Sequence, residues 1–249
     1  HAVRALLERR PQAVRRLIVQ ANRGDRRATE LVELAREKGV AVETRGPQEL
    51  DKLAGGGVHQ GAVARVEPAQ PIDENELYTR IETAPGAPLV LVLDGVQDPH
   101  NLGACLRTAD AAGVTAVIVP RDRATGLTPV VRKVAAGAAE TVAFAQVVNL
   151  ARTLRDLKER NLWIVGTDGE AEQLHHAASL TGPLAVVLGA EGTGMRRLTR
   201  EHCDFVVKLP MLGAVESLNV SVATGVMLYE VLRQRSAPTG TSGDPAGRG

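Results

Sequence analysis

Residues 184–194 read Leu-Ala-Val-Val-Leu-Gly-Ala-Glu-Gly-Thr-Gly, an unbroken apolar run that ends in a glycine-rich loop. An apolar side chain at every position is typical of a strand buried on both faces, as in a parallel sheet. Further short apolar runs, several of them apolar at every position, are expected as strands at 89–93, 116–119, 141–144, 162–165 and 205–209. Helical patterns separate them at 102–112, 129–136, 149–159, 194–201 and 219–234. The alternation predicts a doubly wound, mostly parallel α/β sheet.

A smaller α/β unit is expected to precede this sheet. Residues 1–67 contain helical patterns at 2–8, 27–38 and 47–53 and short apolar runs at 17–19, 40–42 and 62–66. Gly39 stands where many helices close, and residues 55–57 are expected to form a loop. Four prolines mark residues 68–88 as a linker with a short helix near 73–82, so that 89–235 form the second domain. Residues 236–249 are expected to be a disordered tail.

The charge of the chain is unevenly spread. The 249 residues are 44% hydrophobic and 24% charged, which is ordinary for a soluble protein, and the formal net charge is +1. Residues 1–67 carry 13 Lys and Arg against 9 Asp and Glu, whereas residues 68–249 carry 17 against 20. The basic leading part is either a phosphate-contacting surface or a solvated helix face. Aromatic residues make up 2% of the chain, which excludes an aromatic base-stacking platform.

Several other classes are excluded by composition. No apolar run approaches the roughly 18 residues of a transmembrane helix, so no membrane contact is expected. Cys105 and Cys203 match no CxxC spacing and the histidines are scattered, so neither a metal site nor a disulfide framework is expected. Unpaired cysteines fit a reducing compartment, and hence a cytoplasmic location. The chain begins at His1 rather than Met, which indicates that the natural start is missing, and nothing in it looks like a targeting peptide.

The loop Gly189–Gly194 is the first candidate site, because ligands of parallel sheets bind outside the carboxyl ends of the strands. Its GxxGxG spacing differs from the GxGxxG of dinucleotide-binding folds, and it lacks the GK[ST] ending of a phosphate-binding loop. The loop is therefore either a tight strand-to-helix turn or a segment whose backbone closely approaches a small ligand. Glu191, a carboxylate among glycines, is unusual for a mere turn.

Two further loops carry polar side chains. Asp94–Gly103 leads into a helix, with Asn101 expected as the N-cap. Arg107 lies further along that helix and is either a surface residue or a functional one. Ser217 and Asn219 stand at the start of the last helix and suit either capping or a binding site.

Three blocks of sequence, taken in order, resemble one known family. They are DGVQDPHNLGACLRTADAAG at 94–113, VVLGAEGTGM at 186–195 and LPMLGAVESLNVSVATGVMLYE at 209–230. They are similar to the signature blocks of the SpoU/TrmH (SPOUT) family of S-adenosylmethionine-dependent RNA ribose 2′-O-methyltransferases, and the resemblance covers residues 89–235. HAVRALLE at 1–8 and VHQGAVARV at 58–66 look like the ribosomal-protein L30e-like RNA-binding domain of bacterial members that act on large-subunit rRNA.

The resemblance implies a specific activity. It implies methyl transfer from S-adenosylmethionine to the ribose 2′-hydroxyl of a guanosine in 23S rRNA, in the peptidyl-transferase P-loop region. A tRNA or another rRNA is an alternative substrate, and a non-catalytic ribosome-assembly protein is a second alternative, against which the intact motif residues argue. The resemblance also implies a trefoil knot in the carboxyl-terminal part and a homodimer formed through the knotted domain.

The cofactor site implied by the resemblance lies among three loops of the knot. Its residues are Thr167, Gly169, Gly189, Ala190, Glu191, Gly192, Leu209, Met211, Ser217 and Leu218. Leu209 and Leu218 are expected to pack on the adenine, while backbone amides and carbonyls read its polar edge.

The catalytic residues implied by the resemblance are Asn101, Arg107, Glu191, Ser217 and Asn219. The family assigns proton handling to the arginine that matches Arg107. Because a guanidinium rarely gives up its proton, we expect Arg107 to hold a phosphate and stabilise the developing alkoxide instead. Asn101 and Glu191 are expected to orient Arg107 or the substrate. Ser217 and Asn219 are expected to bind the target nucleotide or shape the cofactor loop.

RNA contacts are expected from the leading domain. The candidates are Arg9, Arg10, Arg15, Arg16, His59 and Gln60. His59 is equally well interpreted as a strand-edge histidine without a ligand. Glu216 stands where similar proteins tend to have a small polar residue, and it receives no role.

Overall fold

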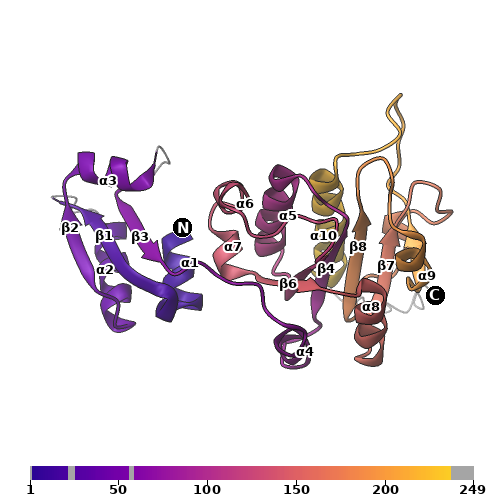
Figure 1. Cartoon of the computed structure of the whole chain (residues 1–249), viewed down its shortest axis with the longest axis horizontal. Helices are drawn as coiled ribbons and strands as arrows, with labels where there is room; N and C mark the ends of the chain where they lie inside the picture. The colour runs from indigo at the N-terminus through magenta and orange to yellow at the C-terminus, as the bar shows by residue number, and fades with distance from the viewer. Residues whose placement is uncertain (1, 22–25, 56–58, 237–249) are drawn as a thin grey trace, which may run out of the picture.

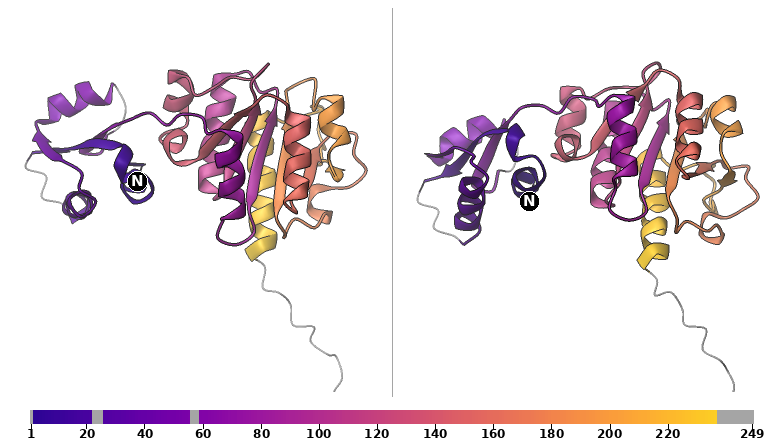
Figure 2. Two further views of the ribbon diagram at one scale, coloured as in Figure 1. Left: turned by 60° about the horizontal axis from the view of Figure 1, so that its bottom comes forward. Right: turned by 90° about the horizontal axis from the view of Figure 1, so that it is seen from below.

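The computed structural model describes residues 2–21, 26–55 and 59–236. Two sheets of different size form, and one extended segment joins the parts that contain them (Figure 1 and Figure 2). The predicted loop at Gly56 and Gly57 and the predicted tail over 237–249 lie outside the described residues. Within the described ranges, every helix is too short or too polar to span a lipid bilayer.

The leading part folds around a three-stranded sheet. Its elements are α1 (Ala2–Arg9), the 3-10 turn η1 (Pro11–Ala13), β1 (Val14–Gln20), α2 (Arg26–Glu37), β2 (Val42–Arg45), α3 (Pro47–Ala54) and β3 (Ala62–Val66). β1 is central, parallel to β2 and antiparallel to β3. The predicted strand at 40–42 is wrong by two residues at its start. Gly39 turns the chain with a φ of +71°, and Val40 is buried in the core before pairing begins at Val42.

Residues 68–88, predicted as a linker, contribute to the second core. Asp73 caps α4 (Glu74–Glu82) by accepting a hydrogen bond of 2.8 Å from a backbone amide of its first turn. Leu77 and Ile81 of this helix are buried against the second sheet. The helix therefore packs with the larger part of the chain, while the domain boundaries themselves stay predictions.

The second sheet has six strands among the described residues, in the order β6-β5-β4-β8-β7-β9, and each observed pair is parallel. The strands are β4 (Leu89–Asp94), β5 (Ala116–Pro120), β6 (Ala143–Val147), β7 (Trp163–Thr167), β8 (Leu184–Gly189) and β9 (Phe205–Val207). The helical elements are α5 (Pro99–Ala111), α6 (Pro129–Val134), α7 (Ala138–Thr141), α8 (Leu150–Glu159), η2 (His175–Ala177), α9 (Arg197–Glu201) and α10 (Val220–Ser236). The predicted parallel α/β sheet is confirmed.

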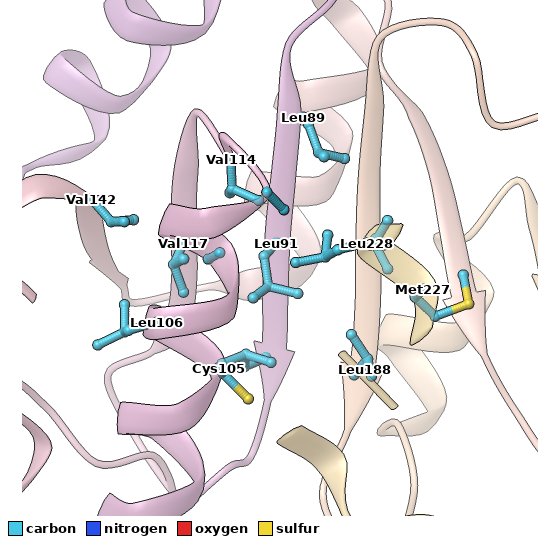
Figure 3. Packing of buried hydrophobic residues seen from close by; sticks show 14 of the residues in the cluster. Leu89, Leu91, Cys105, Leu106, Val114, Val117, Val142, Leu188, Met227 and Leu228 are labelled. Carbon is cyan, nitrogen blue, oxygen red and sulfur yellow. The ribbon is translucent and has the colours of Figure 1, made fainter. Parts of the chain in front are cut away.

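Helices on both faces of this sheet explain its continuous apolar runs. Leu89, Leu91 and Leu93 of β4 join one core with α5, α6, α7 and α10. The alternate residues Val90 and Val92 join a second core with α4 and α8. Figure 3 shows the first core, where labelled side chains of α5 and α10 lie over β4 and β8. Because β4, β5 and β8 are covered on both faces, apolar residues occupy successive positions in them.

The start of α5 differs from the prediction in a way that matters for the site. Asp98 is the N-cap and accepts a hydrogen bond of 2.9 Å from the His100 amide, and Pro99 takes the first helical position. The prediction of Asn101 as the N-cap is therefore wrong. Asn101 lies inside the first turn, where its side chain is free to reach another loop.

Other boundaries differ for local reasons. α9 begins at Arg197 rather than at Gly194, because Ala190 and Gly194 pair with each other and close a turn. β6 begins at Ala143 rather than at Thr141, because Thr141 ends α7, a helix that was not predicted.

Glu230 gives the fold a testable dependence on pH. Its carboxylate accepts hydrogen bonds from Arg233 at 2.7 and 2.8 Å and from Gln234 at 2.8 Å. The bonds from Arg233 lower the pKa of Glu230 from 4.5 to about 2. Because the folded pKa lies below the unfolded one, this carboxylate stabilises the fold above pH 4.5, and that stabilisation is lost as the pH falls towards 2. We expect Glu230→Gln to flatten the pH dependence of the free energy of unfolding in this window, measured by urea denaturation.

The matched control is Glu172→Gln, since Glu172 is exposed and forms no hydrogen bond or ion pair with the described residues. This variant should keep the acid dependence of the unmodified protein. An unchanged slope in Glu230→Gln would contradict the assignment.

The two cysteines are expected to be unreactive in the native protein. Cys105 is buried in α5 with its Sγ 3.4 Å from Thr224 Oγ1 of α10, and Cys203 is half-buried. Burial raises the pKa of the Cys105 thiol to about 11 and that of Cys203 to about 12. Because the thiolate is the reactive form, we expect a disulfide reagent at neutral pH to label neither cysteine until guanidinium unfolds the chain. Rapid labelling of the native protein would contradict this expectation.

Candidate active site

Polar and glycine-rich loops meet where the parallel strands end. Asp94 ends β4, Gly189 ends β8 and Thr167 ends β7, so the following loops share one edge of the sheet. A cavity of about 460 Å³ lies between the loops that follow β4, β5 and β8. It is lined by Asp94, Gly95, Val96, Gln97, Asp98, Asn101, Arg123, Ala190, Glu191, Thr193, Gly194, Arg196 and Val220. Its volume is in the range of small-ligand sites.

A closed hydrogen-bond network joins three of the predicted catalytic residues. Asn101 Nδ2 donates to Glu191 Oε1 at 3.2 Å, and Asn219 Nδ2 donates to the same oxygen at 2.6 Å. Asn219 Nδ2 also donates to Asn101 Oδ1 at 2.9 Å. The Val220 amide gives Glu191 Oε1 a third hydrogen bond at 3.3 Å. Three donors to the same oxygen fix the position of this carboxyl group.

The orientation of Asn219 follows from its place before α10. Asn219 Oδ1 accepts hydrogen bonds from the Ser221 amide at 2.9 Å and from Ser221 Oγ at 2.6 Å. Hydrogen bonds of this kind to the first helical turn are typical of a capping residue. Because Oδ1 faces the helix, Nδ2 faces Glu191, so capping and site geometry use opposite ends of one amide.

The glycine loop after β8 is tight because backbone packs on backbone. Ala190 N donates to Gly194 O at 3.2 Å, and Gly194 N donates to Ala190 O at 2.9 Å. A Cβ on Gly189 would collide with the backbone of Gly194 and Met195. Gly192 and Gly194 have φ values of +76° and +63°, which other residues rarely adopt. The turn presents Glu191 to the network.

The cavity also contains an ion pair with a buried carboxylate, which the sequence did not predict as a site. The Asp94 side chain has an exposed fraction of 0% and accepts hydrogen bonds from Arg196 Nε at 2.6 Å and from the Arg196 amide at 2.9 Å. Arg123, in a left-handed conformation after β5, lines the same cavity. One signal was available, because Asp94 is a carboxylate directly at the end of a fully apolar strand.

Arg107 is not part of this cavity. It lies on the exposed side of α5, six residues after Asn101, and forms no hydrogen bond or ion pair with the described part of the chain. At about 1.5 Å per residue, the two lie roughly 9 Å apart along the helix axis. The structure therefore joins Asn101, Glu191 and Asn219 within one chain but leaves Arg107 and the exposed Ser217 outside the network.

The other predicted cofactor residues border the same edge of the sheet. Thr167 Oγ1 donates to Val187 O at 3.2 Å, which ties β7 to β8. Gly169 is exposed, and Leu209 and Met211 are half-buried. In the loop that follows β9, Leu218 has an exposed fraction of 36%. None of these residues lines the cavity itself.

The basic residues predicted to bind RNA have acidic or backbone partners within the chain. Arg9 pairs with Asp110 of α5 at 2.8 Å, and Arg10 donates to the Glu140 carbonyl at 2.7 Å. These two contacts join the leading part to the second. Further pairs are Arg15 with Glu67, Arg16 with Glu43, and His59 with Asp51. Gln60 is exposed with a φ of +48°. An RNA phosphate would have to compete with these carboxylates.

Glu216 and the predicted absence of a metal site complete the comparison with the sequence. Glu216 is exposed and has no polar partner in the described ranges. Among the described residues, no three His, Cys, Asp or Glu side chains come together as metal ligands.

A polar cavity at the carboxyl ends of a parallel α/β sheet is the usual place for a small-ligand site in this class of fold. Comparison with known proteins identifies the family. The chain belongs to the SpoU rRNA Methylase family, whose model matches residues 88–229. A second model, for substrate binding in RNA 2′-O ribose methyltransferases, matches residues 1–72. The predicted family is confirmed.

Named relatives match nearly the whole chain. The 23S rRNA (guanosine-2′-O-)-methyltransferase RlmB of Pseudomonas putida is 58% identical over 235 residues, which are 94% of this chain and 94% of that protein. The RlmB of Escherichia coli K12 is 53% identical over 236 residues, covering 95% and 97%. The crystal structure of the SpoU methyltransferase AviRb from Streptomyces viridochromogenes with the cofactor AdoMet has a TM-score of 0.69 and 25% identity, covering 94% of this chain and 88% of that one.

Proposed function

We propose that this chain transfers a methyl group from S-adenosylmethionine to the ribose 2′-hydroxyl of a guanosine in 23S rRNA. The observation that carries the proposal is the 58% identity to an enzyme of that name over 94% of both chains. The hydrogen-bond network of Asn101, Glu191 and Asn219 supports the proposal further, because three polar residues of the family motifs meet there. The peptidyl-transferase P-loop region is the proposed location of the target nucleotide.

The proposed mechanism assigns positions and charges to the residues of the site. Bound S-adenosylmethionine would supply a methyl group on its sulfonium, and methylation of the 2′-oxygen would require the hydroxyl proton to pass to a neighbouring acceptor. Glu191 Oε1 accepts three hydrogen bonds, whereas Oε2 accepts none from the described residues, so Oε2 can accept a hydrogen bond from the 2′-hydroxyl. Asn101 and Asn219 hold this carboxylate. Arg107 places positive charge beside a phosphate and the developing alkoxide.

We propose that the loops after β7, β8 and β9 hold the cofactor. The half-buried Leu209 and Met211 and the partly exposed Leu218 offer apolar surface for the adenine. Gly169 has open space where a Cβ would stand, so its backbone is accessible. Thr167, Gly189, Ala190 and Gly192 supply further backbone groups, and Ser217 supplies a hydroxyl. An apolar surface beside open backbone fits an adenine, which has a flat apolar body and polar edges.

The trefoil knot is proposed to build this cofactor site. The loops after β7, β8 and β9 lie against one another at this edge of the sheet: the His175 amide donates to Lys208 O at 3.0 Å, and the Val220 amide donates to Glu191. We further propose an L30e-like domain over 1–67, a linker over 68–88 and the knotted domain over 89–235. The match of residues 1–72 to a substrate-binding model supports an RNA-holding role for the leading part.

A homodimer through the knotted domain is proposed because α10 presents an apolar stripe. Val222, Val226 and Tyr229 are 51%, 37% and 54% exposed and recur at helical spacing. Arg107 lies on the exposed side of α5, the neighbouring helix. A partner subunit on this surface would bring its own site residues near Arg107. Light scattering coupled to size-exclusion chromatography tests the assembly directly.

Two alternative functions differ from the proposed one in substrate or in catalysis. A tRNA-directed or other rRNA-directed methyltransferase of the family would use the same site on a different substrate. A non-catalytic rRNA-binding protein is disfavoured because the site network is complete. A cytoplasmic location is proposed from the two free cysteines.

The deciding experiment is methylation of 23S rRNA transcript with labelled S-adenosylmethionine, followed by mapping of the modified ribose. Label at one guanosine of the peptidyl-transferase region supports the proposal. Label on tRNA but not on 23S rRNA would identify the alternative substrate. Binding of either RNA without methylation would support a non-catalytic role.

A further inference from the structure

The cavity contains positive charge that the methyl-transfer network does not use. Arg196 and Arg123 line it, and neither was implied by the family's motif residues. Arg196 is 44% exposed at its side chain, while its partner Asp94 is fully buried. A buried carboxylate that binds Nε and the backbone amide of one arginine holds that side chain in place.

The outer nitrogens of Arg196 remain available for a ligand. Arg196 donates to Asp94 through Nε, and neither Nη1 nor Nη2 has a partner among the described residues. Arg123 likewise forms no hydrogen bond or ion pair with the described ranges, and its carbonyl lies beside Gly95 at the cavity edge. The cavity therefore presents a fixed pair of parallel donors on Arg196, with a second guanidinium lining the same space.

The overall charge of the cavity argues against a phosphate as the occupant. Asp94, Asp98 and Glu191 contribute three negative charges, against two from the arginines. A neutral group with acceptors on one edge and donors on the other fits this lining better. Guanine has that arrangement, because O6 and N7 are adjacent acceptors and its Watson–Crick edge carries N–H donors.

We infer that Arg196, held by Asp94, recognises the target guanine by donating from Nη1 and Nη2 to O6 and N7. This inference rests on the proposed function, since it names the residue that selects the base of the methylated nucleotide. Adenine and cytosine present an amino donor where guanine presents the O6 acceptor, so their amino groups would face the guanidinium donor to donor, which is repulsive. Arg196 is thus a specificity residue, and Asp94 is the residue that positions it.

The test uses the unmodified full-length protein and a 23S rRNA fragment with 7-deazaguanosine at the mapped position. This analogue lacks N7 but keeps O6 and the Watson–Crick edge. We expect kcat/KM for the analogue to be about tenfold lower than for guanosine, the size of a lost contact to a base edge. Equal rates on both RNAs would overturn the inference. Failure to methylate any guanosine would instead overturn the proposed function.

Two variants separate base recognition from phosphate binding. Arg196→Ala and Arg196→Lys should each lower kcat/KM on the guanosine RNA and bring the ratio between the two RNAs close to one. A point charge is sufficient for a phosphate, so recovery by lysine, or a loss in Arg196→Ala that leaves the ratio unchanged, would overturn the inference. Arg197→Ala is the matched control, because Arg197 is exposed and pairs only with Glu201 in the described ranges. Thermal unfolding and S-adenosylmethionine binding verify that each variant is folded.

Discussion

Replacing Arg107 with alanine is expected to lower kcat by at least about a hundredfold while leaving the Kd for S-adenosylmethionine unchanged. Removing one donor that stabilises a developing negative charge typically costs about 10²–10³ in kcat. Cofactor affinity should persist because Arg107 lies outside the cavity and bonds to none of the loops that follow β7, β8 and β9. Single-turnover methylation and isothermal titration of S-adenosylmethionine measure the two quantities separately.

Two control variants accompany this prediction: one keeps the positive charge at position 107, and the other removes an exposed arginine elsewhere. Arg107→Lys should retain part of the activity if charge alone is needed. Arg155→Ala should leave turnover unchanged, since Arg155 is an exposed arginine of α8 on the opposite face of the sheet, with no polar partner among the described residues. A loss of cofactor binding as large as the loss of turnover would refute the role given to Arg107.

Mixed dimers test whether Arg107 acts on the partner's site. If it does, mixing Arg107→Ala with Glu191→Ala subunits creates one site that holds both native residues, and activity returns. If Arg107 serves its own subunit, the mixed dimer has no complete site and stays inactive. The exposed position of Arg107, outside the cavity of its own chain, favours the first outcome.

Gly189→Ala is expected to abolish measurable cofactor binding and to destabilise the fold. The added Cβ would collide with the backbone of Gly194 and Met195, and backbone cannot move aside as a flexible side chain can. Overpacking of a well-packed site costs about 1–3 kcal/mol, and here the loop that carries Glu191 must open to relieve it. Urea denaturation should show the lower free energy of unfolding, and titration should show the lost binding.

Gly182→Ala is the matched control for this effect. Gly182 precedes β8, has no atom within 4 Å of the Cβ position, and does not have a left-handed φ. This variant should bind S-adenosylmethionine normally. Normal binding by Gly189→Ala as well would show that the glycine loop opens at little cost, and would contradict the close packing of Gly189 on Gly194.

Most of the fold could be predicted because its causes are local. The apolar run at 184–188 and its counterparts mark strands covered on both faces, and each overlaps an observed strand. Errors occurred where short-range signals compete. Asp98 and Pro99 start α5 before Asn101, and the four residues of α7 replace the start of a predicted strand at Thr141. These boundaries depend on which side chain caps a helix, and several candidates stand next to one another in the sequence.

The site was less predictable because its contacts are remote in sequence. Asn101 and Glu191 were candidates, but the bond between them joins residues 90 positions apart. Arg196 was not a candidate, since its position depends on the buried Asp94, 102 residues earlier. Arg107 remains a prediction, because its proposed partner lies in the RNA or in a second subunit.

The parallel α/β sheet and the family could be predicted from the sequence, because periodicity and motif order depend on residues that are close together in the chain. The folded structure was needed to show which polar groups meet, namely Glu191 with Asn101 and Asn219, and Arg196 with Asp94. The reason is physical. A hydrogen bond requires donor and acceptor within about 3 Å. The packing of β4 beside β8 brings Asp94 and Asn101 to the loop after β8, and α10, which packs against β8, brings Asn219 there.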